Sequence, residues 1–304
     1  MTLGANLERD RLTRRARRVK TVIAAFRRQA DGQRAEAHAG SPNLHQAIAQ
    51  FEAELPANHA RLSDHGSQPA AGHVHRPERG SVGSMEIEAF IDFICPRCYI
   101  AVRHLSDALA MFEHRDDVRI VWRSFQLDVI SGRSFDEVLV GSVMRNHRMN
   151  RADATAVAET VHMKLREAAA RAGLAYDPGM TTPGDTFAAH RILQLAAARG
   201  VADLAVERIQ RAYFEQGMAI DNRESLSLLA AEIGIDPDTA RSVAFSDAYA
   251  DAVFDDRDRA ESRGIWSVPF FICADEFVVS GTASPRWMHE IMKRCWDVRY
   301  RESW

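Results

Sequence analysis

The chain has 304 residues, of which 46% are hydrophobic and 27% charged, with four cysteines and a net charge of −3 at pH 7. This content is enough for a core in one or two domains, and no run approaches the 18 apolar residues of a membrane helix. Four cysteines in so long a chain do not make a disulfide framework. The composition therefore excludes a membrane-spanning helix and a small fold that is stabilised mainly by disulfide bonds.

The first 84 residues differ from the rest. Residues 1–84 hold 13 Lys and Arg against 8 Asp and Glu, a balance of +5, whereas the remainder holds 26 against 34, a balance of −8. The negative balance of the remainder gives no reason to expect nucleic-acid binding. Arg14 to Arg28 can form a basic helix and Leu44 to Leu55 a second one, but Pro56 to Gly83 has few apolar residues to bury. We expect a poorly ordered basic extension over 1–84.

Two interpretations of this extension stay open. The basic helix can bind an anionic surface, and His65, His73 and His75 can ligate a metal. A solvated tail explains both the basic residues and the histidines without either function. The N-terminus lacks the compact apolar segment of a signal peptide, so the sequence predicts a cytoplasmic protein. Because Met85 begins the part that resembles a globular domain, residues 1–84 are expected to be either a genuine extension or an upstream start.

The strongest chemical signal lies where a predicted strand meets a predicted helix. Ile87 to Ile94 is a short run of β-branched and aromatic residues, as in a buried strand. Pro96 then stands at the first position of a helix, where a missing N–H is tolerated, and apolar residues recur at helical spacing from Val102 to Phe112. Cys95 and Cys98 therefore lie at a strand–helix junction.

That junction suits a redox-active dithiol. Free N–H groups and the positive dipole end of a helix N-terminus stabilise a thiolate, and they lower a cysteine pKa from about 8.5 to roughly 3.5–7.5. We therefore expect Cys95 to be the attacking thiolate. Cys98, one turn on, can attack the mixed disulfide and release the partner. Arg97 adds a positive charge between them.

Two other interpretations of the cysteine pair compete with this one. A Cys-x-x-Cys is half of a zinc site, but zinc needs a second pair of ligands, and the remaining cysteines, Cys273 and Cys295, are 22 residues apart. The pair can also be two unrelated buried cysteines. The strand–Cys-Pro-x-Cys–helix context favours redox chemistry over both, with no metal.

After this helix, Val118 to Arg123 alternates in the manner of a strand, which completes a βαβ unit with a right-handed crossover. A long helical stretch follows, at about 131–245, and four to five helices fit within it. Its boundaries are signalled by Gly173, by a cap at Asp185 or Thr186, by Gly200, by a variant capping box at Asp221 and Glu224, and by Asp236-Pro237.

The chain then returns to the sheet. A polar helix over about Ser246 to Arg263 precedes two short strands, Pro269 to Cys273 and Phe277 to Ser280, which form an antiparallel hairpin. Ser284-Pro285 opens the last helix, and its buried stripe includes Cys295. Both cysteines of this region are expected to pack as small hydrophobic side chains.

These motifs resemble the DsbA-like branch of the thioredoxin superfamily, and within it the FrnE-like oxidoreductases, over roughly residues 85–300. The resemblance implies an α/β thioredoxin-like fold with an all-helical domain inserted at about 131–245. The family usually carries an aromatic residue where Arg97 stands, so its redox tuning does not transfer. The matching motifs are Asp92 to Ile100, Trp122 to Leu127, Asp185 to Arg191, Ala212 to Phe214 and Ser267 to Phe271.

The resemblance also implies roles beyond the cysteine pair. It implies that Val268–Pro269 is cis and faces Cys95, so that the Val268 backbone can pair with an extended substrate. From the residues alone an ordinary trans proline stays open, because only about 5–6% of X–Pro bonds are cis. His190 either faces the cleft or packs as a buried helix histidine. The candidate catalytic residues are Cys95, Cys98 and Pro269, and the candidate substrate-binding residues are Pro96, Arg97, Val268 and His190.

The leading interpretation is a thiol–disulfide oxidoreductase that acts on protein or small-molecule thiols and disulfides and needs no cofactor. Its direction follows its reduction potential. A sister branch, the kappa-class glutathione transferases and hydroxychromene-carboxylate isomerases, shares the inserted helices but typically has a lone serine where Cys95 stands, so the two cysteines favour the oxidoreductase. A non-enzymatic alternative is a chaperone-like module that holds unfolded chains without using the cysteines.

Overall fold

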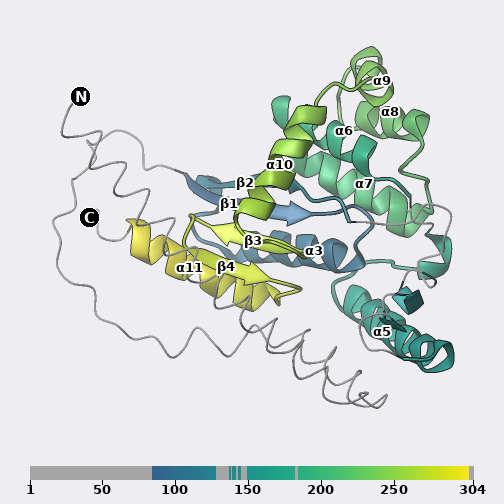
Figure 1. The fold of residues 1–304 in the computed structure, drawn as a ribbon. Coiled ribbons are helices and arrows are strands. Elements are labelled where there is room, and N and C mark those ends of the chain that lie inside the picture. The colour runs from purple at the N-terminus through teal and green to yellow at the C-terminus, as the bar shows by residue number, and fades with distance from the viewer. Residues whose placement is uncertain are drawn as a thin grey trace.

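A computed structural model of the chain describes residues 84–127, 137, 139–141, 143–144, 149–181 and 184–300 (Figure 1). The predictions for residues 1–83, and the start of the helical stretch near residue 131, lie outside the described residues. The predicted βαβ unit is present. It consists of β1 (Met85–Ile91), α3 (Pro96–Met111) and β2 (Val118–Ser124).

The described strands form one mixed sheet in the order β2-β1-β3-β4. β1 and β2 run parallel, which requires a crossover, and α3 supplies it. β3 (Phe270–Cys273) pairs antiparallel with β1, and β4 (Phe277–Ser280) pairs antiparallel with β3, as the hairpin prediction requires. β1 is thus a central strand, and its carboxyl end leads directly to the cysteine pair.

Helices cover both faces of this sheet (Figure 1). α3 and α11 (Pro285–Tyr300) pack side by side on one face, and α10 (Ala250–Ser262) crosses the other. Within the part of the chain that the structure describes, no helix is long and apolar enough to cross a membrane.

The described part of the chain between β2 and α10 is mainly helical and packs beside the β2 edge of the sheet (Figure 1). α6 to α9 contact one another, α6 and α7 also contact β2, and α5 contacts α3. The predicted thioredoxin-like fold with an inserted helical domain is confirmed. The α-helices of the insertion that the structure describes over their whole length are α5 (Arg151–Arg171), α6 (Phe187–Ala198), α7 (Ala202–Gln216), α8 (Arg223–Glu232) and α9 (Pro237–Phe245).

Most helix boundaries follow the signals in the sequence. Gly173 follows α5 with a φ of 69°, in the left-handed region that favours glycine. Asp236 caps α9, and Pro237 is the first residue of that helix. The predicted cap of α8 is wrong by one residue. Asn222, not Asp221, caps this helix, because its side-chain oxygen accepts a backbone N–H of the first turn at 3.0 Å.

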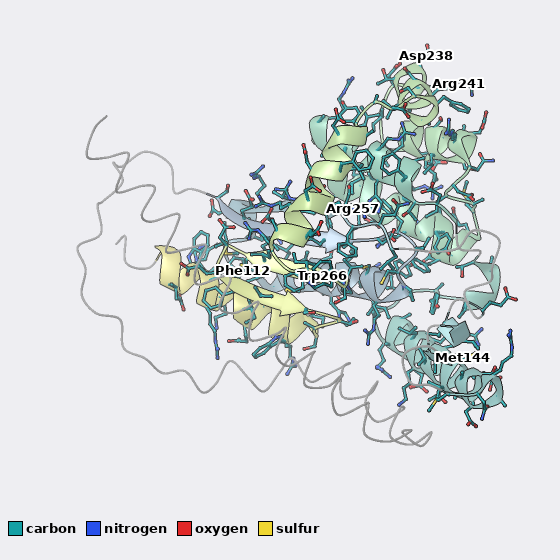
Figure 2. All side chains as sticks on the ribbon, viewed as in Figure 1. Phe112, Met144, Asp238, Arg241, Arg257 and Trp266 are labelled. Atoms are coloured by element: carbon teal, nitrogen blue, oxygen red, sulfur yellow. The ribbon has the colours of Figure 1, made fainter. Side chains whose placement is uncertain are left out.

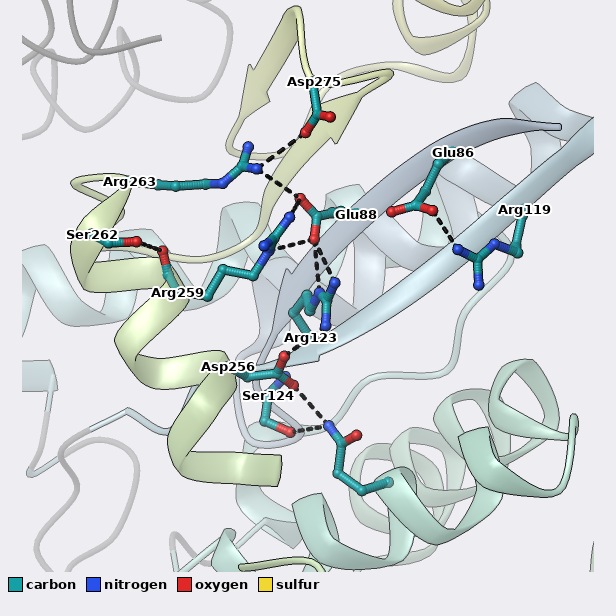
Figure 3. A network of polar contacts seen from close by, with 11 residues as sticks. Glu86, Glu88, Arg119, Arg123, Ser124, Asp256, Arg259, Ser262, Arg263 and Asp275 are labelled. Carbon is teal, nitrogen blue, oxygen red and sulfur yellow. Dashed lines mark hydrogen bonds and ion pairs between the residues drawn. The ribbon is translucent and has the colours of Figure 1, made fainter. Parts of the chain in front are cut away.

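A buried polar network fastens α10 to the sheet (Figure 3). Glu88 of β1 is only 2% exposed. Its carboxylate accepts hydrogen bonds from Arg123 of β2 at 2.8 Å and from two nitrogens of Arg259 of α10 at 2.6 and 2.7 Å. Asp256, also on α10, accepts from Arg123 at 3.0 Å and from the backbone N–H of Ser124 at 2.8 Å. Arg123 therefore bridges two buried carboxylates from different elements.

The pKa values of Glu88 and Asp256 are shifted in opposite directions, so their contributions to the stability of the fold depend on pH in opposite ways. Burial raises the pKa of Glu88, but the hydrogen bonds and charges of Arg259 and Arg123 outweigh it, so this pKa is lowered overall. At Asp256 burial dominates, and the pKa is raised. A lowered carboxylate pKa stabilises the fold above the unfolded-state pKa, and this contribution is lost as pH falls through the folded-state pKa. A raised pKa contributes stability that is lost as pH rises.

We predict that Glu88→Gln lowers the free energy of unfolding at pH 7 by about 2–3 kcal/mol, somewhat below the cost of breaking a fully buried pair because the arginines are partly exposed. Denaturant unfolding measures this. Glu86→Gln on the same strand is the control, since the exposed Glu86–Arg119 pair should contribute only about 0–1 kcal/mol. The difference between wild type and Glu88→Gln should shrink as pH falls through the lowered pKa of Glu88. Equal losses in both variants would contradict the prediction.

Candidate active site

Cys95 lies at the junction between β1 and α3. It is the N-cap of α3, Pro96 is the first helical residue, and the Cys95 sulfur accepts the backbone N–H of Cys98 at 3.4 Å. The backbone N–H of Cys95 donates in turn to the carbonyl of Asp92 at 3.3 Å. Cys95 is 6% exposed and Cys98 is 0% exposed, and both are free thiols. The first cysteine is therefore the one that solvent can reach.

The two thiols differ in acidity. The pKa of Cys95 is lowered, chiefly because the Cys98 thiol donates a hydrogen bond to its sulfur; burial opposes this shift. The backbone N–H of Cys98 and the charge of the half-buried Arg97 lower the pKa further. The pKa of Cys98 is raised well above its ordinary value by burial and by the hydrogen bond to Cys95. Cys95 is thus the more acidic of the two thiols.

The loop before β3 brings a backbone carbonyl to the reactive sulfur. The Val268–Pro269 bond is cis, as the resemblance implies. The Val268 carbonyl oxygen lies 3.8 Å from the Cys95 sulfur. The carbonyl of Pro269 accepts the N–H of Gly281 at 2.9 Å, which ties this loop to the chain after β4. The structure thus brings together four of the predicted residues: Cys95, Cys98, Val268 and Pro269.

Trp266, two residues before Val268, was missed by the sequence analysis. Its side chain is 63% exposed, and Figure 2 shows it near the end of α10. The signal in the sequence was an aromatic residue in a turn, between a polar helix and a strand that enters the site. Trp266 is two residues from Val268, whose carbonyl lies beside the Cys95 sulfur, so its exposed indole is a candidate contact for a substrate.

A buried carboxylate lies next to the dithiol. Asp92 is 0% exposed, and its side chain accepts the N–H of Leu127 at 2.7 Å. Its charge raises the pKa of both Cys95 and Cys98. The sequence analysis placed Asp92 in a motif but gave it no role. A carboxylate at the end of an apolar run, three residues before the first cysteine, was the available signal.

His190 occupies a different place from the predicted substrate contact. Its side chain is 0% exposed and offers no surface to a substrate, so the buried alternative describes its position. Its Nε2 atom lies 3.2 Å from Oδ1 of Asp92, and its ring lies 5.0 Å from the ring of Phe93. His190 therefore contacts the site from inside the protein, through Asp92.

Aromatic side chains join the inserted domain to the thioredoxin-like part beside the site. Tyr99, the residue after Cys98, stacks on Phe214 of α7 with ring centroids 4.7 Å apart and donates a hydrogen bond to Glu215 at 2.6 Å. Trp122 of β2 donates to Asp203 of α7 at 2.6 Å. The first turn of α3 is thereby held between the sheet and the insertion.

The other two cysteines are buried, as predicted. Cys273 of β3 is 4% exposed, with its sulfur 3.8 Å from the sulfur of Met85, and Cys295 of α11 is 1% exposed. Among the described residues, no group of three or more His, Cys, Asp or Glu side chains is placed to hold a metal ion.

A cysteine pair at this strand–helix junction, opposite a cis proline, is the arrangement of the thioredoxin-like dithiol proteins. The family model described as a DSBA-like thioredoxin domain matches residues 86–293. The chain therefore belongs to this family, as the sequence motifs predict. The FrnE-like subgroup stays a prediction.

Solved structures agree with this assignment. A probable DsbA oxidoreductase from Streptomyces coelicolor is 32% identical, with a TM-score of 0.61 over 71% of this chain and 91% of that chain. A 2-hydroxychromene-2-carboxylate isomerase is 16% identical, with a TM-score of 0.54 over 72% of this chain and 100% of that chain. At that identity the likeness shows the fold alone. A comparison with curated proteins gave no match.

We predict that Arg97→Trp raises the pKa of Cys95, because the positive charge of Arg97 stabilises the Cys95 thiolate. The increase should be less than about one unit, since the hydrogen bonds from Cys98 contribute more to this stabilisation. The reduced form then loses stability and the reduction potential becomes more negative. A thiolate-absorbance titration and equilibration with glutathione measure the two effects. Arg103→Trp, at an exposed position of the same helix, is the control. An unchanged or lower pKa in Arg97→Trp would show that the charge of Arg97 does not act on Cys95.

Proposed function

We propose that the protein is a thiol–disulfide oxidoreductase that exchanges disulfides with its substrates through Cys95 and Cys98. The observation that carries this proposal is the asymmetry of the pair. The slightly exposed thiol of Cys95, with a lowered pKa, accepts a hydrogen bond from the fully buried thiol of Cys98, with a raised pKa. Membership of the DsbA-like family and the 32% identity to a probable DsbA oxidoreductase support it.

The exchange takes two steps. The Cys95 thiolate attacks one sulfur of a substrate disulfide; the substrate S–S bond breaks, a Cys95–substrate disulfide forms, and the other substrate sulfur leaves as a thiolate that takes up a proton. Cys98 then loses its proton and attacks the Cys95 sulfur, which releases the second substrate thiol and leaves a Cys95–Cys98 disulfide. Two electrons pass to the substrate. The reverse sequence oxidises a substrate dithiol, and the reduction potential sets the direction.

The surroundings of Cys95 favour a polypeptide substrate over a small thiol. The Val268 backbone lies next to the reactive sulfur, where an extended chain can pair with it. Trp266 adds an exposed aromatic surface two residues away in the chain. Cytoplasmic location and independence of a cofactor, both predicted from the sequence, are part of this proposal.

The hydrogen bonding of the pair also favours a dithiol mechanism over the alternatives. A glutathione transferase or isomerase of the sister branch uses one residue at the position of Cys95 and has no need of a second thiol. A chaperone-like module needs neither cysteine. In this structure the buried thiol of Cys98 is the largest influence on the acidity of Cys95.

We predict that Cys98→Ser accumulates a mixed disulfide between Cys95 and substrate, because the thiol that releases the substrate is absent. Cys95→Ser should abolish turnover and trap nothing, since Cys98 is buried and its pKa is raised. Intact-protein mass spectrometry under non-reducing conditions detects the adduct. Cys295→Ala is the control and should turn over normally. An adduct on Cys95→Ser would reverse the two roles.

We predict that Trp266→Ala lowers kcat/KM for a disulfide peptide with apolar residues beside its cysteines by roughly tenfold relative to glutathione disulfide, the size expected for an aromatic contact at an interface. Competition between the two substrates measures the ratio. Leu228→Ala on α8, also 63% exposed, is the control and should leave the ratio unchanged. A parallel loss with both substrates would mean that Trp266 supports the loop and does not select the substrate.

A further inference from the structure

His190 connects the inserted domain to the carboxylate beside the dithiol. Its Nε2 atom lies 3.2 Å from Oδ1 of Asp92, and both side chains are 0% exposed. Its backbone N–H donates to the carbonyl of Thr186, the N-cap of α6, at 2.9 Å. The first turn of α6 thus holds the His190 backbone, and the ring of Phe93 and the Asp92 carboxylate contact its imidazole.

The surroundings indicate which proton the imidazole carries. Oδ2 of Asp92 already accepts the N–H of Leu127, and Oδ1 accepts best from an N–H at Nε2 of His190. Nδ1 of His190 is buried and has no hydrogen-bond partner among the described residues. A second N–H there would be an unsatisfied buried donor, which is costly. The neutral tautomer that donates from Nε2 therefore fits this site.

The groups that face Asp92 come from three helices. Cys95 is the N-cap of α3 and Cys98 lies in its first turn, His190 belongs to α6, and Tyr213 belongs to α7. The pKa of Tyr213 is raised mainly by burial, with a contribution from the charge of Asp92. Within the described part of the chain, the His190 imidazole and the Leu127 backbone N–H are the hydrogen-bond donors to the Asp92 carboxylate. The hydrogen bond from the inserted domain is therefore a principal support of this buried charge.

We propose that His190 is a positioning residue for the redox reaction, which holds the Asp92 carboxylate beside the two thiols and thereby sets how readily the Cys95–Cys98 disulfide is reduced. This inference rests on the proposed function. The charge of Asp92 opposes a thiolate at either cysteine. Without His190 the carboxylate keeps, among the described residues, only the hydrogen bond from Leu127 and is free to turn away from the thiols. A carboxylate that has turned away opposes the Cys95 thiolate less, so the reduced protein gains stability and the disulfide becomes more oxidising.

The test measures the equilibrium constant between the Cys95–Cys98 disulfide and glutathione, together with the thiolate titration of Cys95. His190→Leu removes the donor at similar volume, and we expect it to shift the constant toward the reduced protein by up to about tenfold, the change expected when one nearby charge no longer raises the pKa of a thiol by about one unit. His190→Gln keeps an N–H donor at comparable reach and should stay close to wild type. Asp92→Asn should shift the constant in the same direction as His190→Leu.

The double variant separates this effect from a loosened fold. In an Asp92→Asn background, His190→Leu should shift the constant by less than about twofold, because the charge it acts through is absent. Fully additive shifts, or an unchanged constant in His190→Leu alone, would overturn the proposal. If His190→Leu does not fold, His190→Asn, whose shorter amide does not reach Asp92, gives the same comparison with His190→Gln.

Gln194→Leu is the matched control. Gln194 lies one turn after His190 on α6, and its amide donates to Ser124 at 2.9 Å and to Asp256 at 2.7 Å, in the network that fastens α10. Its loss should lower stability and leave the glutathione equilibrium unchanged. An equal shift in Gln194→Leu would mean that any disturbance of α6 reaches the dithiol. A wild-type protein that exchanges no disulfides would refute the proposed function itself, before any His190 variant is compared.

Discussion

The hydrogen bonds that the Cys95 sulfur accepts from Cys98 are the interaction on which the rest of this site depends. Both cysteines are almost fully buried, and burial by itself raises the pKa of a thiol. The thiol and backbone N–H of Cys98 reverse this effect at Cys95. They can do so only because α3 starts at Pro96, directly after Cys95, which places Cys98 in the first turn of the helix, beside the Cys95 sulfur. The chain geometry of one junction thus creates two thiols of opposite character.

That junction stays in place because β1 is anchored along its whole length. β2 and β3 pair with it on either side. Glu88 of β1 also accepts hydrogen bonds from Arg123 of β2 and Arg259 of α10. At the far end Asp92 accepts the backbone N–H of Leu127. A shift of β1 along its neighbours would break these contacts together, so the register of the sheet and the position of Cys95 are fixed by the same interactions.

The sequence predicts the parts of this architecture that local patterns encode. Apolar runs, caps and prolines located β1, α3, the hairpin and most helices, and the Cys95–Cys98 spacing located the dithiol. The partners of buried charges were not predictable in this way. Asp92 and His190 are 98 positions apart, and Glu88 and Arg259 are 171 apart. Periodicity assigns a residue to a face of an element, but it does not say which distant side chain meets it there.

Because its parts come from distant segments, the site exists only in the fully folded chain. The thiols come from the start of α3, the carbonyl beside them from the loop before β3, and the support of Asp92 from α6. Tyr99 and Trp122 hold the insertion against this junction. An isolated helix that starts with Cys-Pro-Arg-Cys would keep the helix dipole and the backbone N–H of Cys98, but it would lack the charge of Asp92 and the His190 imidazole that supports it. The inserted domain therefore contributes to the chemical environment of the two thiols as well as to the packing of the fold.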